Sequence, residues 1–434
     1  MLRRHTLNAF SIYLIIACLN GFGLTFAQAV SSIYQVETIK MNALQLILAG
    51  TTLEVACFLF QVPTGIVADL YSRRLSVIIG YIVFGIGYIV MGLAPRFELV
   101  LLSSVIWGAG YTFIAGAEEA WVADEIGEER AGRAFLRGSQ VGMAASLLAI
   151  PLSITLGKHL SLQLPIMLGG GMLVALGLFL ALFMPERHFQ LAKREERNSW
   201  HAMGRQMVEG GKVVRRNSML LCIFGVTLFV GLASEGFDRL DTAHFLQDIT
   251  LPHLWRLASL DWFSVIGVGS TLLAIGANEI INRKANISRP RVLIGLLFAL
   301  NMLLIGSVAL FALAGNFAIA LLAYWCARVI RSVLSPLHNT WLTQNTEGRT
   351  RATVISFDGM VDPIGQIAGG PIVGVIGARF SIRAALLTTA LLMSPVVIFF
   401  LRALGLSKPG KREEEGSAML EKEIVDEIIP TPEL

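Results

Sequence analysis

Long apolar runs, separated by short polar breaks, fill most of the chain. Twelve of these runs approach the ~20 residues that a helix needs to cross a bilayer, and the breaks between them hold charged residues, Pro and Gly. Because unpaired backbone groups are not tolerated in lipid, such spans are helical. The sequence therefore predicts an all-α polytopic membrane protein. The predicted helices cover residues 9–31, 43–67, 75–94, 98–121, 134–156, 163–184, 219–240, 258–281, 292–314, 316–340, 352–377 and 382–403.

The longest hydrophilic connection, residues 187–217, divides these helices into six and six. We therefore expect an N-terminal six-helix bundle over residues 1–186 and a C-terminal six-helix bundle over residues 218–403. The connection is basic and amphipathic, so it either lies on anionic lipid at the membrane surface or is a plain soluble linker. Residues 404–434 are acidic and lack apolar periodicity, which predicts a disordered cytoplasmic tail.

Composition agrees with a membrane protein. Hydrophobic residues make up 54% of the chain and charged residues 15%, which is too apolar for an ordinary soluble protein. Most of the 35 lysines and arginines lie in the N-terminal segment, in alternate loops and in the tail. Since cytoplasmic loops carry the positive excess, both termini are expected in the cytoplasm. We therefore expect a multi-pass protein of the cell membrane, in contact with membrane lipids.

No motif for catalysis stands out in the sequence. It contains no phosphate-binding Gly-x-x-x-x-Gly-Lys, which argues against direct ATP drive. The seven histidines show no metal-ligand spacing, and the four cysteines lie in apolar runs without a Cys-x-x-Cys pair. The basic linker of a membrane protein is poor evidence for nucleic-acid binding. We expect no enzyme activity, no cofactor, no metal site and no nucleic-acid partner.

A charged turn joins the second and third predicted helices. Four positions carry its pattern: Gly65, Asp69, Arg73 and Arg74. The pattern resembles the loop 2–3 signature of the major facilitator superfamily, from which Leu70 and Ser72 depart. The resemblance, which extends over residues 1 to about 403, implies two bundles that rock about a central site by alternating access. It also implies that this turn holds the bundles together in one of the states. The alternative is an ordinary charged turn that follows the positive-inside rule.

Two further stretches, residues 116–124 and 231–245, are similar to the drug-exporter branch of that superfamily, which includes macrolide and tetracycline exporters. The resemblance implies proton-coupled export of a small amphipathic or drug-like compound, so the expected partners are a small-molecule substrate and protons. Two marks of such exporters are missing, because Ser104 stands where many carry an Arg and the fifth helix lacks their Gly-Pro signature. The alternatives are uptake or facilitated transport of a metabolite or lipid-like molecule, and a transport-inactive receptor or sensor of the same fold.

Acidic residues deep in the predicted helices are candidates for proton coupling, because ionisable groups are costly inside a membrane. Glu54 lies near the middle of the second helix, where a desolvated carboxylate can exchange protons near neutral pH. Glu235 is a second candidate, with Asp238 and a local partner, Arg239, within four residues. The structural alternatives are an interhelical hydrogen bond for Glu54 and a hydrated salt-bridge cluster for the other three.

The tenth and eleventh predicted helices hold four more charges. Arg328 and Arg331 are three residues apart, and Asp358 and Asp362 are four apart, so each pair shares a helix face. Asp358 and Asp362 join the candidates for proton coupling. Because Arg331 and Asp362 lie at similar depth, we predict an ion pair between them, which acts either as a gate or as a purely structural charge pair.

The superfamily resemblance places a substrate cavity between helices 1, 4, 7 and 10. These helices offer an aromatic-rich set with few polar groups, which suits a bulky amphipathic or cationic compound. The alternative for each aromatic side chain is packing between helices. The candidate cavity residues are Asn20, Thr25, Gln28, Trp107, Tyr111, Phe237, Tyr324 and Trp325.

Overall fold

The computed structural model describes residues 8–189, 200–252, 258–284, 289–348 and 350–407. All regular elements in these residues are helical, and twelve segments are long and apolar enough to cross a membrane. The predicted fold class is therefore confirmed. The apolar runs located the spanning helices because each run must satisfy its backbone hydrogen bonds internally while it presents apolar side chains to lipid.

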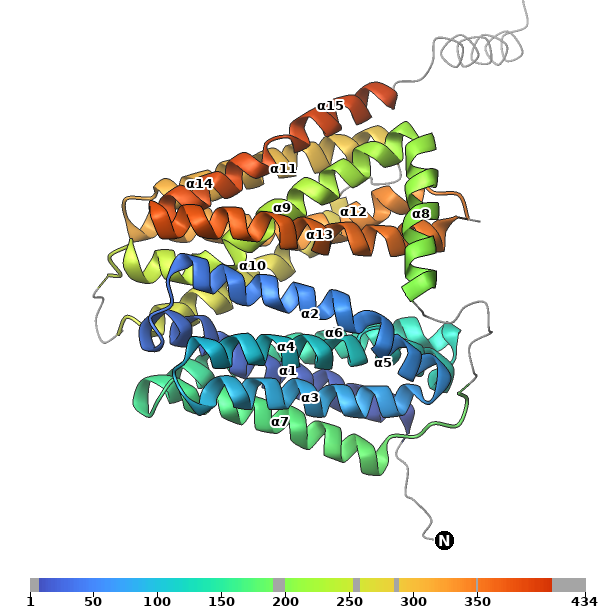
Figure 1. The fold of residues 1–434 in the computed structure, drawn as a ribbon, viewed down its shortest axis with the longest axis horizontal. Coiled ribbons are helices and arrows are strands. Elements are labelled where there is room, and N and C mark those ends of the chain that lie inside the picture. Colours follow the sequence, from blue (N-terminus) through green and yellow to red (C-terminus); the bar gives the residue numbers. More distant parts are fainter. Residues whose placement is uncertain (1–7, 190–199, 253–257, 285–288, 349, 408–434) are drawn as a thin grey trace, which may run out of the picture.

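The N-terminal bundle forms the lower half of Figure 1. Within it, α3 packs against α4 and α7, and α1 packs against α6 and α7. Its elements are α1 (Ala9–Ile33), the π-helical turn η1 (Tyr34–Thr38), α2 (Ala43–Leu70), α3 (Arg73–Leu93), α4 (Phe97–Ile114), α5 (Ala117–Ile126), α6 (Glu128–His159) and α7 (Gln163–Phe183).

The C-terminal bundle forms the upper half of the same view. Here α9 packs against α13 and α14, while α12 packs against α10 and α11. Its elements are α9 (Ser218–Gln247), α10 (Asp261–Lys284), α11 (Pro290–Leu313), α12 (Phe317–Gln344), α13 (Arg351–Arg379), α14 (Ile382–Met393) and α15 (Val396–Leu406).

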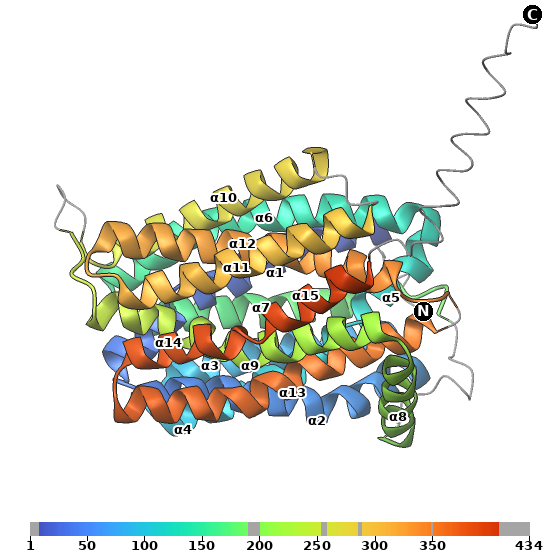
Figure 2. The ribbon, with the colours of Figure 1, turned by 90° about the horizontal axis from the view of Figure 1, so that it is seen from above.

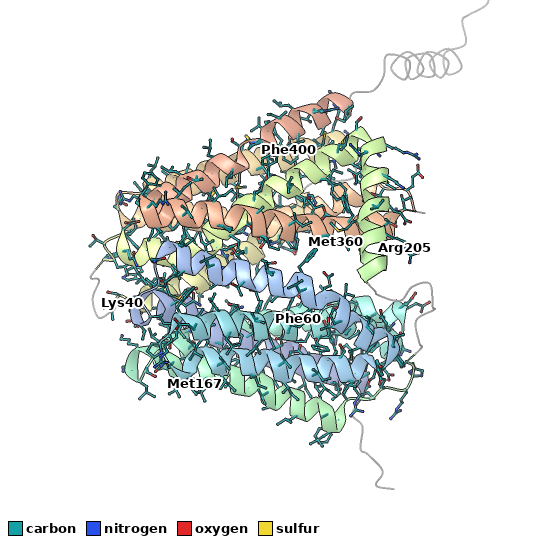
Figure 3. All side chains as sticks on the ribbon, in the orientation of Figure 1. Lys40, Phe60, Met167, Arg205, Met360 and Phe400 are labelled. Atoms are coloured by element: carbon teal, nitrogen blue, oxygen red, sulfur yellow. The ribbon has the colours of Figure 1, made fainter. Side chains whose placement is uncertain are left out.

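The bundles meet where α2 packs on α13 and α9, and where α6 packs on α10. We call the end of the molecule that carries α8 (Trp200–Arg216) the linker end, and the opposite end the far end. Figure 3 marks the linker end with Arg205 and the far end with Lys40. At the far end, Lys158 on α6 forms an ion pair with Asp261 on α10, with 2.6 Å between Nζ and Oδ2. This ion pair joins the two bundles.

Helix α8 forms most of the described part of the predicted linker, of which residues 190–199 lie outside the described residues. It runs across the axes of the spanning helices (Figures 1 and 2) and packs on α13 and α9. Its surface is two-sided: Arg205, Lys212 and Arg215 are exposed, whereas Gly210 and Val214 are buried. Most of the predicted acidic tail, from residue 408 onward, also lies outside the described residues.

Two predicted helices are interrupted. The last one, over residues 382–403, is divided into α14 and α15. The other break lies before α5. The sequence predicts a continuous helix over residues 98–121, whereas α4 ends at Ile114 and α5 begins at Ala117. At the break, Gly116 has a φ of 77°, a left-handed conformation that glycine adopts at little cost. The backbone N–H of Gly116 donates to the Glu119 carboxylate at 3.0 Å, which caps the start of α5. The break therefore sets α5 apart from α4, and Glu118 on α5 reaches the central cavity.

Candidate functional site

A cavity of about 1000 Å³ lies between the two bundles and draws its wall from both. Its lining is rich in hydroxyl, amide and charged side chains. Five of the eight residues predicted for a substrate cavity lie in this wall: Asn20, Thr25, Gln28, Trp107 and Tyr324. The seam between bundles is where a transporter of this architecture is expected to hold its substrate.

Two predicted cavity residues are packing residues instead. Phe237 is 2% exposed and stacks on Tyr324 with 5.8 Å between ring centroids. Trp325 turns toward α10, where its Nε1–H donates to the carbonyl oxygen of Ile266 at 3.0 Å. The prediction was wrong for these two because membership of a cavity helix does not say which way a side chain points around that helix.

A second cavity of about 660 Å³ lies between α2, α4 and α13. It contains the remaining predicted residue, Tyr111, whose ring stacks on Trp107 at 5.8 Å and 7°. Three residues line both cavities and therefore mark the junction between them: Glu54, Trp107 and Gln366.

Glu54 is the acidic residue at this junction. Its carboxylate makes no hydrogen bond or ion pair to any residue that the structure describes. The charged groups that face it come from both neighbouring helices of the other bundle: Glu235, Asp238 and Arg239 on α9, and Asp362 on α13. Three of these four groups are acidic, so Glu54 lies in a region with a surplus of carboxylates. Such a region favours binding of protons or of a cation.

The predicted local pair between Glu235 and Arg239 is confirmed, with 3.1 Å between Oε2 and Nε. The Glu235 side chain is 3% exposed, whereas that of Arg239 is 32% exposed. The pair lies directly against Gly50 on α2, where an added Cβ atom would overlap both Glu235 Oε2 and Arg239 Nε. An ion pair of the C-terminal bundle therefore docks onto a glycine of the N-terminal bundle.

The predicted ion pair between Arg331 and Asp362 is wrong. Arg331 donates two hydrogen bonds to Asp238 on α9, at 2.5 and 2.7 Å, and Asp362 instead accepts one from Gln366 at 2.7 Å. Similar depth in the membrane does not make two residues neighbours, and the face of α12 that carries Arg331 is turned toward α9. Arg328 lies on the same side, with 3.6 Å between its Nη1 and Asp238 Oδ1.

Asp358 lies outside both cavities, inside the C-terminal bundle. It accepts a hydrogen bond from the Thr227 hydroxyl at 2.8 Å and faces His338, with 3.4 Å between Oδ2 and Nε2. Among the predicted proton-coupling residues, Glu54, Glu235 and Asp238 line the larger cavity and Asp362 the smaller one. Asp358 is thus the one whose surroundings fit a structural role best.

The charged turn between α2 and α3 is tied to its own bundle. Arg73 forms an ion pair with Asp124 on α5, and its Nη1–H also donates to the Ala120 carbonyl oxygen at 3.0 Å. Arg74 donates to the Ala181 carbonyl oxygen at 2.6 Å, and its backbone N–H donates to Glu186 at 3.0 Å. The implied role of this turn in holding the two bundles together stays a prediction.

Sequence reasoning missed three polar residues that the fold brings to the cavities. Glu118 accepts a hydrogen bond from the Tyr81 hydroxyl at 2.7 Å and lines the larger cavity, a position that depends on the break before α5. Asp241 and Gln366 lie in the same wall. The signal for Asp241 and Gln366 is the presence of an acidic or amide side chain inside an apolar run. Among the described residues, no group of three or more His, Cys, Asp and Glu side chains is arranged to hold a metal ion.

Comparisons with known proteins agree with this geometry. A family model described as Major Facilitator Superfamily matches residues 13–307. An uncharacterized MFS-type transporter of Bacillus subtilis (strain 168), YxaM, is 23% identical over 395 residues, which cover 90% of this chain and 94% of that protein.

Several solved structures are also similar. The nucleoside transporter NupG superposes with a TM-score of 0.72 at 17% identity, covering 93% of this chain and 100% of that chain. A bacterial homolog of the human lysosomal transporter Spinster gives 0.71 at 13% identity, over 93% of this chain and 98% of that one. The peptide transporter POT gives 0.69 at 14% identity, over 92% and 94%. At these identities the structures share the fold, and the fold alone does not identify a substrate.

Proposed function

Because the chain belongs to the Major Facilitator Superfamily, and is thus a membrane transporter and not an enzyme, we propose that it couples movement of a small polar solute to protons bound at Glu54. The observation that carries this proposal is the position of Glu54, an acidic residue without a hydrogen bond or ion pair to the described residues, at the junction of two cavities. A desolvated carboxylate among other carboxylates is suited to bind and release a proton.

Alternating access gives the proton a means of driving the solute. In the far-end half of the molecule the bundles are held together by the ion pair between Lys158 and Asp261 and by the docking of Glu235 and Arg239 onto Gly50. Glu54 lies one helical turn from Gly50, so its charge acts directly on the contact that must open and close. We place the protein in the cell membrane with both termini in the cytoplasm, following its distribution of basic residues.

Export of a small amphipathic or drug-like compound is the second candidate. The observation that favours it is the stacked pair of Trp107 and Tyr111 at the junction of the cavities, since aromatic faces bind flat or cationic compounds. The polar wall of the larger cavity favours a polar solute, because an apolar ligand would displace water from these polar groups without offering them hydrogen bonds.

The test is substrate-dependent proton flux in liposomes that contain the purified protein and an internal pH dye. The panel contains uridine, a dipeptide, glucuronate, tetracycline, erythromycin and lysophosphatidylcholine. We expect one class of compound in this panel to cause proton flux in liposomes that contain the wild-type protein. Glu54→Gln should reduce that flux to the background of empty liposomes. Glu98→Gln, which changes an exposed carboxylate in the first turn of α4, is the matched control and should transport normally.

Two results would overturn the proposal. In the first, Glu54→Gln retains the proton-to-solute ratio of the wild type, which would remove Glu54 as the coupling residue. In the second, the wild type moves a solute without any proton flux, which would make the protein a facilitator or couple it to another ion.

A further inference from the structure

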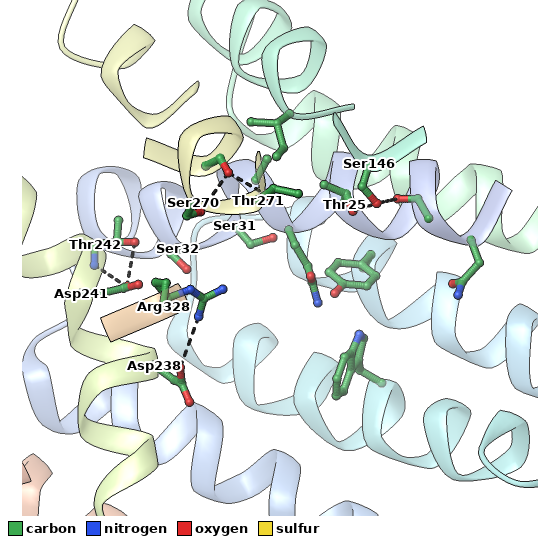
Figure 4. A pocket seen from close by; sticks show the side chains of 18 of the residues that line it. Thr25, Ser31, Ser32, Ser146, Asp238, Asp241, Thr242, Ser270, Thr271 and Arg328 are labelled. Atoms are coloured by element: carbon green, nitrogen blue, oxygen red, sulfur yellow. Dashed lines mark hydrogen bonds and ion pairs between the residues drawn. The ribbon is translucent and has the colours of Figure 1, made fainter. Parts of the chain in front are cut away.

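Arg328 lies in the far-end part of the larger cavity. The wall there comes from α1, α9, α10 and α12, and it carries five hydroxyl side chains. Figure 4 shows the guanidinium of Arg328 with Asp238 on one side and Ser31 and Ser32 on the other. The hydroxyl residues of this chamber are Ser31, Ser32, Thr242, Ser270 and Thr271.

Within the protein, the guanidinium of Arg328 has only a weak ion-pair contact. Both carboxylate oxygens of Asp238 accept hydrogen bonds from Arg331, at 2.7 Å or less. Arg328 Nη1 stands 3.6 Å from Asp238 Oδ1, beyond hydrogen-bond length. Its side chain is 45% exposed, against 30% for Arg331. Arg328 lines the cavity, and among the described residues no hydrogen bond from it is formed, so N–H donors of its guanidinium remain available to a ligand.

The other groups around Arg328 are accounted for. Those that face it are Asp238 and Asp241 on α9, and Tyr324 and Arg331 on α12. Asp241 accepts hydrogen bonds at Oδ1 from the backbone N–H and the hydroxyl of Thr242, at 2.5 and 3.1 Å. Arg331 and Asp238 satisfy one another. Arg328 is therefore the guanidinium in this cluster that is available to a ligand.

The hydroxyl groups of the chamber act toward a ligand mainly as acceptors. Ser31 donates its proton to the carbonyl oxygen of Ala27 at 2.7 Å, and Ser270 and Thr271 both donate to that of Gly267 at 2.9 Å. A hydroxyl that has given its proton to the backbone presents only its oxygen lone pairs. The chamber thus combines one cationic donor with several neutral acceptors and the Asp241 carboxylate.

From this arrangement we propose that Arg328 binds the carboxylate or phosphate group of a small organic anion that also carries hydroxyl or amino groups. The planar guanidinium matches either anion with two parallel hydrogen bonds. The hydroxyl or amino groups of the ligand donate to the serine and threonine oxygens and to Asp241. The ligand needs these donors because an anion without them would face the carboxylate of Asp241 uncompensated. This inference rests on the proposed function and names the substrate class of the same cavity.

The test compares matched pairs of compounds on the purified protein by thermal unfolding and by tryptophan fluorescence titration. The pairs are glucuronate with glucose, for a carboxylate, and uridine monophosphate with uridine, for a phosphate. We expect the anionic member of at least one pair to bind the wild type more tightly than its neutral partner does. Arg328→Gln should weaken the binding of that anion about 10- to 100-fold. The neutral member should be unaffected by this substitution.

Two variants keep the result interpretable. Arg328→Lys retains the positive charge but not the planar guanidinium that forms two parallel hydrogen bonds, so it should recover only part of the affinity. Arg96→Gln, which removes an exposed guanidinium at the far end, should bind like the wild type. A folded Arg328→Gln protein that binds the anions as tightly as the wild type would overturn the inference. So would tighter binding of the neutral member, or no binding of either anion to the wild type.

The two proposals fail in different ways. If the anions bind through Arg328 but the wild type moves no protons with them, proton coupling at Glu54 is wrong and the anion site stands. If proton flux follows a neutral solute and Arg328→Gln leaves that flux unchanged, the anion site is wrong and proton coupling stands.

Discussion

Asp238 is held by two guanidinium groups, and the contact with Arg331 is much the stronger of the two. Arg331 reaches it with two hydrogen bonds from α12, and this cross-helix pair fixes the C-terminal wall of the cavity next to the chamber of Arg328. The side chains of the two partners are 31% and 30% exposed, so part of their charge is screened. Each residue is nevertheless the main counter-charge of the other.

We predict that Asp238→Asn destabilises the protein by about 2 kcal/mol, because it leaves Arg331 without its carboxylate and replaces two charge-assisted hydrogen bonds. The transport rate of this variant should also fall. The exchange Asp238→Arg with Arg331→Asp should recover part of the stability, which thermal unfolding of the wild type and the two variants in detergent would measure. An exchange variant no better than Asp238→Asn would argue that the pair has no direct role.

The same residues show how far sequence reasoning reaches. Glu235 and Arg239 were paired correctly because four residues along a helix place two side chains on one face. Arg331 was given the wrong partner because its true neighbour belongs to another helix, and depth along an axis says nothing about rotation around it. Phe237 and Trp325 were misplaced in the cavity for the same reason. Local contacts can be derived from spacing, whereas contacts between helices depend on packing that spacing does not specify.

At the scale of elements, the hydrophobic pattern predicted the spanning helices and gave no indication of the break before α5. A glycine in an apolar run is common, and only the backbone conformation shows that Gly116 lies at a break between two helices. The contact between α2 and α9 likewise depends on a single glycine, Gly50, since any side chain there would meet the ion pair of Glu235 and Arg239. The absence of a side chain at Gly50 thus allows the close approach of these helices at this point.

We predict that Gly50→Val prevents α2 and α9 from closing at this point. Overpacking of this kind typically costs about 1–3 kcal/mol, and here the cost falls only on states in which the far end is closed. The variant should therefore shift the protein toward a far-end-open state, which labelling of single cysteines in far-end loops would report as faster modification. Gly276→Val is the control, because a Cβ at that position meets no atom within 4 Å. Equal labelling of the two variants would show that this contact does not control closure.

At the scale of the whole molecule, the two bundles are joined at the far end by the ion pair of Lys158 and Asp261, while α8 lies across the linker end (Figure 1). If the bundles rock during transport, the distance between these two residues must increase once in every cycle. In a background without the native cysteines, joining Lys158→Cys to Asp261→Cys with a short bis-maleimide should therefore abolish transport. The control joins Glu279→Cys to Arg283→Cys, an exposed ion pair within the single helix α10, and should leave transport intact because it constrains no movement between bundles. Transport that continues after complete cross-linking of the first pair would exclude separation of α6 and α10 at the far end, and with it the rocking motion proposed for this protein.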